Sequence, residues 1–148
     1  MSPPSSRSPV VVFGVGAVLG ALLWAAWLGW DRTASYDVMT GTVQDPYVTL
    51  QVLGCALTVG LVTAYLAARW HPAAAAIGVG LGFWVAWTAW ASATDGSGLW
   101  AVGAVMLAAG LAGGTAVAAA AGAGIRAAID ARRRRMGKAP AGPDTGAD

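Results

Sequence analysis

The chain has 148 residues, of which 57% are hydrophobic and only 11% are charged, and its formal net charge is +2. A soluble domain usually carries about 25% charged residues, so this composition excludes an ordinary soluble protein and predicts that most of the chain lies in lipid. The single cysteine, Cys55, lies in an apolar run and excludes an intrachain disulfide.

Four charge-free stretches are long enough for a helix to cross the bilayer, which takes about 20 apolar residues. Helices are the expected form because lipid offers no hydrogen-bond partner to bare backbone groups. Short links predict that successive helices pack antiparallel. The predicted fold class is therefore an all-α membrane protein, an antiparallel four-helix transmembrane bundle with spans at about residues 9–30, 47–68, 73–92 and 98–125.

These spans form one predicted transmembrane domain over residues 9–130. Residues 1–8 are expected to be a disordered leader, and residues 131–148 a basic and then disordered cytoplasmic tail. The first apolar stretch is longer than the usual signal-peptide core of about 7–15 residues. We therefore expect a retained helix, with cleavage as the alternative.

A polar stretch, DRTASYDVMTGTVQDPY at residues 31–47, separates the first two spans. Its Thr40-Gly41 step is a turn signal between residues that tolerate extended backbone, which predicts a short hairpin or a compact loop. Its acids are either solvated charges outside the membrane or, together with Asp95, a cluster above the tryptophans described next. Under the second interpretation, which we favour for function, Asp37 and Asp45 recognise a partner or a cationic ligand. The spacing of Asp31, Asp37 and Asp45 matches no calcium loop, and we predict no metal and no cofactor.

Two tryptophan stripes share a spacing of three residues, which places each stripe on one side of a helix. Both follow a glycine at the same distance, Gly20 and Gly80, which hints at a duplicated helical hairpin. One interpretation is an aromatic belt at the outer interface. The other is a pair of facing stripes that line an outward-facing groove for an apolar or cationic ligand. The stripes are Trp24, Trp27 and Trp30 in the first span and Trp84, Trp87 and Trp90 in the third.

Every span also carries small residues at four-residue spacing, the pattern that lets membrane helices approach closely. Such ridges can be used within the chain or between subunits. They comprise Gly16 and Gly20; Ala56, Gly60, Ala64 and Ala68; Ala74, Gly78 and Gly82; and Gly110, Gly114, Ala118 and Gly122.

The basic residues predict the orientation of the spans. With four crossings, all of them except Arg32 fall on one side, which marks that side as cytoplasmic and places both termini inside. The basic segment after the fourth span is either a topology signal alone or a surface for anionic lipid. Its residues are Arg126, Arg132, Arg133, Arg134, Arg135 and Lys138.

Catalytic and transport chemistry is missing from the sequence. No charged side chain lies inside a span, whereas ion-coupled transporters usually need one. The only histidine, His71, has no cysteine or second histidine to complete a metal site. We therefore predict that the chain is not an enzyme, and that it binds no nucleic acid.

The layout resembles small uncharacterised four-span integral membrane proteins of actinobacteria. The resemblance rests on YDVMTGTVQDPY followed by VTLQV, on the Ala/Gly-rich spans and on the Arg-rich tail. It implies a multi-pass protein of the bacterial inner membrane and carries no activity.

Two functions follow as expectations. The first is a non-enzymatic membrane module for accessory, assembly or envelope-sensing roles, which acts through helix packing and the acidic outer loop on a protein partner or a second copy. The alternative is a permease for a small solute or lipid that works as an oligomer.

Overall fold

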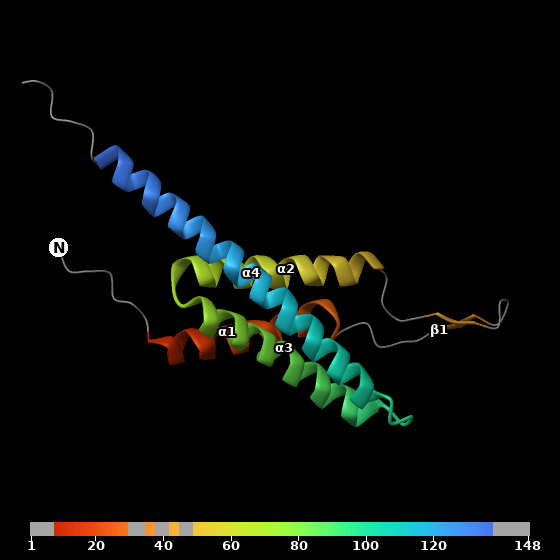
Figure 1. The fold of residues 1–148 in the computed structure, drawn as a ribbon. Helices are drawn as coiled ribbons and strands as arrows, with labels where there is room; N and C mark the ends of the chain where they lie inside the picture. The colour runs from red at the N-terminus through yellow and green to blue at the C-terminus, as the bar shows by residue number, and fades with distance from the viewer. Residues whose placement is uncertain (1–7, 30–34, 38–41, 45–48, 138–148) are drawn as a thin grey trace, which may run out of the picture.

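The computed structural model describes residues 8–29, 35–37, 42–44 and 49–137. Within them the chain forms four helices, each long and apolar enough to cross a membrane, as the sequence predicts. A small two-stranded hairpin lies between the first two helices (Figure 1). The elements are α1 (Pro9–Trp27), β1 (Ser35–Asp37), β2 (Thr42–Gln44), α2 (Thr49–Arg69), α3 (Pro72–Thr94) and α4 (Trp100–Gly137).

Local sequence explains where the helices begin. Ser8 caps α1 by accepting a hydrogen bond from the backbone N–H of Val11, and Pro9 fills the first helical position, where its missing N–H costs nothing. Pro72 occupies the same position in α3. Gly98, with φ of 75°, makes the turn that leads into α4.

The closest helix pair is α1 with α3, which are not neighbours in sequence. Gly16 lies against Gly78, and Gly82 lies against Ala17, so two of the predicted small-residue ridges interlock within one chain. These contacts advance in the same direction along both helices. In lipid, such close packing replaces the hydrophobic driving force that helices have in water.

The fourth helix packs on both α2 and α3. Gly122 of α4 lies against the backbone of Ala64 in α2. The contacts between α3 and α4 advance in opposite directions along the two helices, since Gly80 faces Thr115 whereas the later residue Trp87 faces the earlier residue Gly103.

Strands β1 and β2 pair antiparallel, with Tyr36 opposite Val43, as the turn signal predicts. Among the described residues they contact only each other, and Figure 1 shows them projecting beyond the start of α2, apart from the turn between α3 and α4.

Helix α4 continues unbroken to Gly137 and projects past the ends of the other helices (Figure 1). The expected boundary at residue 130 therefore lies inside a helix. The predicted leader at 1–8, apart from Ser8, and the last part of the predicted tail, 138–148, lie outside the described residues.

Candidate functional site

A groove with a volume of about 560 Å³ lies between α2 and α4. Its walls are small or apolar side chains of both helices, and α3 forms its floor. The lining is Val52, Cys55, Ala56, Val59 and Gly60 from α2, Met106, Leu107, Gly110, Leu111, Gly114 and Thr115 from α4, Phe83 and Trp87 from α3, and Leu28 after α1.

The groove exists because α2 and α4 touch at one level and separate at the next. At Gly122 a Cβ would lie 2.2 Å from the backbone oxygen of Ala64. One or more turns earlier in each helix, a Cβ on Gly60, Gly110 or Gly114 would meet no atom within 4 Å. The ridges of α2 and α4 therefore meet at Ala64 and Gly122, whereas around Gly60, Gly110 and Gly114 they leave backbone accessible along the groove.

Polar groups contribute little to the groove. The hydroxyl of Thr115 is buried and donates a 2.7 Å hydrogen bond to the backbone oxygen of Leu111, within its own helix. A second cavity of about 460 Å³ lies between α3 and α4, and Leu111 and Thr115 line this one as well. No charged side chain lines either cavity, so neither offers acid–base or ion-binding chemistry.

The tryptophans of the two stripes meet at one point. The rings of Trp24 and Trp90 have centroids 6.3 Å apart and are tilted by 49°. The other described members lie between helices. Trp27 contacts Gly54 of α2, and Trp87 contacts Gly103 of α4. The indole Nε1 of Trp84 donates a 2.8 Å hydrogen bond to the backbone oxygen of Ala104 in α4.

Each stripe therefore spreads over several helix interfaces. Trp87 lines the groove between α2 and α4, and Trp84 lines the cavity between α3 and α4. Trp30 lies outside the described residues, and a belt or ligand role for the stripes stays a prediction.

The proposed hairpin duplication finds mixed support. Trp27 and Trp87, the middle members of the two stripes, each place a ring edge on a glycine of the following helix. Gly20 and Gly80 have different surroundings, because Gly20 packs on α3 whereas Gly80 faces Thr115.

The structure describes only part of the acidic set. Asp37 ends β1, and Asp31 and Asp45 lie outside the described residues. The described part of the chain holds no group of three or more residues able to bind a metal.

Asp95, which sequence reasoning grouped with the loop acids, organises the start of α4. Its carboxylate accepts hydrogen bonds from the hydroxyl and N–H of Ser97 and from the N–H of Trp100, at 2.6, 2.8 and 2.7 Å. The side-chain bond from Ser97, followed by these backbone bonds, lowers the pKa of Asp95. The signal was in the sequence: an acid and a serine directly before an apolar run are typical of a helix start.

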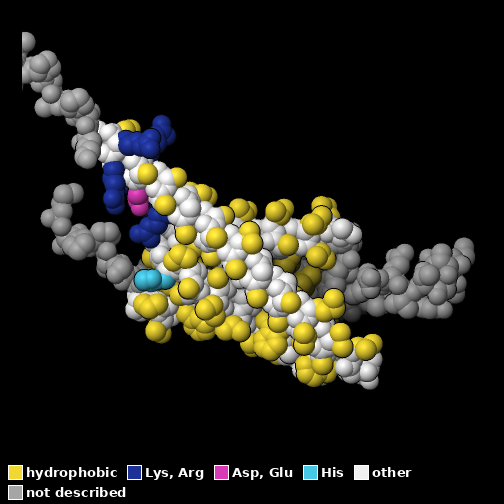
Figure 2. Space-filling model, in the orientation of Figure 1, with side chains coloured by type: hydrophobic (Ala, Val, Ile, Leu, Met, Phe, Trp, Pro, Cys, Tyr) yellow, Lys and Arg dark blue, Asp and Glu magenta, His cyan; other side chains and the backbone are white. Residues whose placement is uncertain are grey.

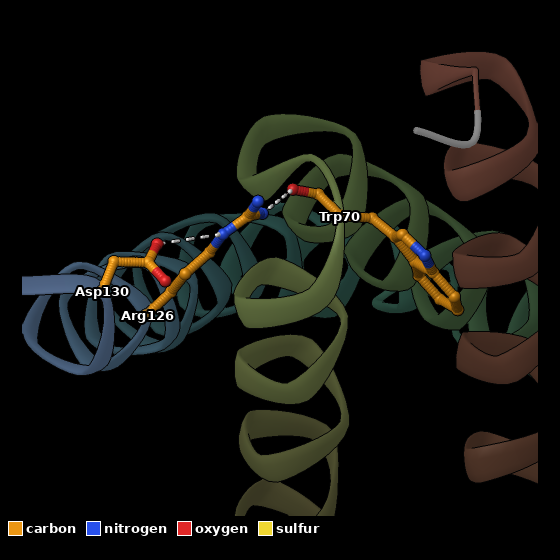
Figure 3. A network of polar contacts seen from close by, with 3 residues as sticks. All are labelled: Trp70, Arg126 and Asp130. Atoms are coloured by element: carbon orange, nitrogen blue, oxygen red, sulfur yellow. Dashed lines mark hydrogen bonds and ion pairs between the residues drawn. The ribbon is translucent and has the colours of Figure 1, made fainter. Parts of the chain in front are cut away.

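The basic residues gather where α4 projects, as the dark blue side chains in Figure 2 show. Arg132, Arg133, Arg134 and Arg135 are exposed, and Lys138 lies outside the described residues. Arg126 differs from them because its Nη1 donates a 3.4 Å hydrogen bond to the backbone oxygen of Trp70, between α2 and α3 (Figure 3).

Sequence reasoning also missed the role of Gln51. Its side-chain amide donates a hydrogen bond to the backbone oxygen of Trp27, at the end of α1. Glutamine at the start of an apolar span was the available signal, because a polar side chain in lipid needs a partner.

A comparison of the chain with models of protein families, with curated proteins and with solved structures found no match.

Proposed function

We propose that the chain is a non-enzymatic integral membrane module that binds a transmembrane helix of another protein in the groove between α2 and α4. The observation that carries this proposal is the unoccupied space beside Gly60, Gly110 and Gly114. Small residues at four-residue spacing allow a second helix backbone to come close, which is the main source of helix association in lipid.

The dimensions of the groove support a helix as its occupant. From Val52 to Gly60 it follows α2 for about 12 Å, at a rise of 1.5 Å per residue. That length is about two helical turns. Its lining is almost wholly apolar, so an incoming helix needs only apolar side chains at i, i+4 and i+7 to fill it.

Orientation forms part of the proposal. We infer an antiparallel bundle in the bacterial inner membrane, with both termini in the cytoplasm. The opposite contact order of α3 and α4 supports antiparallel neighbours. The arginines that end α4 support a cytoplasmic C-terminus. The hairpin with Asp37 then lies outside, where it contacts the outer part of the same partner.

The test uses the full chain, expressed in a bacterial host, with a photoreactive residue in place of Met106, which lines the groove and is 72% exposed. We expect it to crosslink to one other membrane protein, whereas a crosslink only to a second copy of the chain would point to a homo-oligomer instead. The same probe in place of Val105, which is 70% exposed but outside the groove lining, is the matched control.

Filling the groove supplies the second arm of the test. Gly110→Leu together with Gly114→Leu should abolish the crosslink at position 106 without disturbing the fold, since neither new side chain meets a neighbour at its Cβ. Gly113→Leu, equally free of neighbours and absent from the lining, should leave it intact. Crosslinks of equal yield in all three proteins would count against a helix in the groove.

An oligomeric permease for a small solute or lipid remains the second candidate. Its support is that two cavities lie on either side of Leu111 and Thr115. Because both linings are nearly all apolar, the transported molecule would itself be apolar. Flux across liposomes that contain only this chain would favour the permease over the module.

A further inference from the structure

A third hollow, of about 240 Å³, lies where α4 passes the turn between α2 and α3. One wall is apolar and includes Ala67, Pro72 and Ala123, and Trp70 stands beside it. The remaining wall carries two opposite charges, Arg126 and Asp130. Because it lies where the apolar helices α2 and α3 end and begin, a membrane spanned by these helices would place the hollow at the height where lipid headgroups meet water.

The two charges are only loosely paired. The Nε atom of Arg126 lies 4.0 Å from the carboxylate of Asp130, and the side chains are 53% and 55% exposed (Figure 3). Arginine placed four residues before an acid is the weaker order for a helical pair. An exposed pair of this kind contributes little. The bond from Arg126 to the Trp70 oxygen uses only Nη1, so the other N–H donors of Arg126 and the carboxylate of Asp130 can take other partners at small cost.

We propose that this hollow binds the headgroup of a zwitterionic, amine-bearing phospholipid, a phosphoethanolamine lipid. Its phosphate lies against the guanidinium of Arg126, which presents several N–H donors in a fork suited to phosphate. Its ammonium group lies against Asp130. The glycerol and the first methylenes of its acyl chains lie on Ala67, Pro72 and Ala123.

The pair of charges distinguishes this lipid from others. A choline headgroup has the same phosphate but no N–H to donate to Asp130. A glycerol headgroup carries no cation, so its phosphate meets Arg126 while Asp130 repels it. The exposed arginines at 132–135 attract every anionic lipid, but they do not line the hollow and bring no carboxylate with them.

The experiment is native mass spectrometry of the delipidated full chain, titrated in detergent with palmitoyl-oleoyl phosphatidylethanolamine, phosphatidylcholine or phosphatidylglycerol. We expect the ethanolamine lipid to bind about fivefold more tightly than the choline lipid, as one exposed charge pair allows. Asp130→Asn should remove that preference and strengthen phosphatidylglycerol binding about twofold to fivefold. Arg126→Gln should weaken binding of the ethanolamine lipid about fivefold.

Arg132→Gln is the matched control, because it removes one arginine of the same helix from outside the hollow and should leave the preference unchanged. Equal binding of the ethanolamine and choline lipids to the native chain would overturn the proposal. So would a preference that survives in Asp130→Asn, whose exposed position leaves folding intact even if Arg126→Gln is unstable. Neither result bears on helix binding in the groove between α2 and α4, so this inference can be wrong while the proposed function holds, and the reverse.

Discussion

Gly82 of α3 lies so close to Ala17 of α1 that a Cβ at position 82 would be 2.0 Å from the backbone oxygen of Ala17. No side chain larger than hydrogen fits at this distance without moving one of the two backbones. At this point the packing of α1 on α3 leaves no room for even one methyl group.

We expect Gly82→Ala to lower the free energy of unfolding in detergent by about 1–3 kcal/mol, the usual cost of an overpacked contact. Gly80→Ala is the control, because its Cβ would lie 3.6 Å from the Thr115 hydroxyl, an ordinary contact. Thermal unfolding followed by circular dichroism measures both. If the two variants melt together, the close approach of α1 and α3 is wrong.

A second prediction separates two tryptophans of equal chemistry. Trp84 donates a hydrogen bond from α3 to α4, whereas the buried indole Nε1 of Trp24 finds no partner among the described residues. Trp84→Phe should therefore destabilise the protein by about 1 kcal/mol, the scale of hydrogen bonds between membrane helices. Trp24→Phe should cost less, because it removes an indole N–H that has no partner. A larger loss in Trp24→Phe, measured by the same thermal unfolding, would contradict this assignment.

The third prediction concerns acid. Because its hydrogen bonds lower the pKa of Asp95 in the folded protein, the ionised form stabilises the start of α4. That contribution is complete above the ordinary carboxyl pKa and is lost as the pH falls through the lowered value. We expect the melting temperature of Asp95→Ala to lie below that of the native chain at neutral pH. The difference should shrink on acidification, and a gap that stays constant down to the acid limit would exclude the ionised carboxylate as the cause.

The fourth prediction tests the orientation. Alkaline phosphatase, which is active only outside the cytoplasm, should be active when fused after Asp37 and inactive when fused after Arg135. The reason is that arginine resists translocation and collects inside. Activity at both positions, or the reverse pattern, would contradict the arrangement of four crossings with both ends in the cytoplasm.

Sequence patterns predicted the helices well because lipid imposes a length and excludes charge. The predicted start of the first span, residue 9, is the start of α1, and α2 ends within one residue of the expected 68. The hairpin was predicted from a local signal, the turn residue Gly41 between residues that tolerate extended backbone. The fourth span was predicted to end at about residue 125, whereas α4 continues to Gly137, because arginine is a good helix former and nothing after Ile125 forces the helix to stop.

The pairing of helices could not be read from the sequence. All four spans carry similar ridges, so spacing alone does not tell that Gly78 meets Phe13 whereas Gly114 meets nothing within 4 Å. The tryptophan stripes present the same difficulty, because a period of three places Trp27 on a face without naming the helix opposite. The hydrogen bonds of Asp95 were not predicted, although the acid and serine before an apolar run signalled a helix start, because Asp95 was considered only as a charge beside the loop acids.

Because α4 is unbroken and Gly122 is seated on Ala64, we expect α4 to act as a lever that pivots at Gly122. One arm carries Gly110 and Gly114, and the other carries the arginines. If a bound helix tilts the first arm by about 10°, Gly137 is displaced by about 4 Å, given a rise of about 1.5 Å per residue. Spin labels at Arg69 and Arg133 would register this as a distance change when the groove is filled, and an unchanged distance would exclude it. A rigid rod of this kind would report an event within the bilayer to the aqueous compartment without any conformational switch in between.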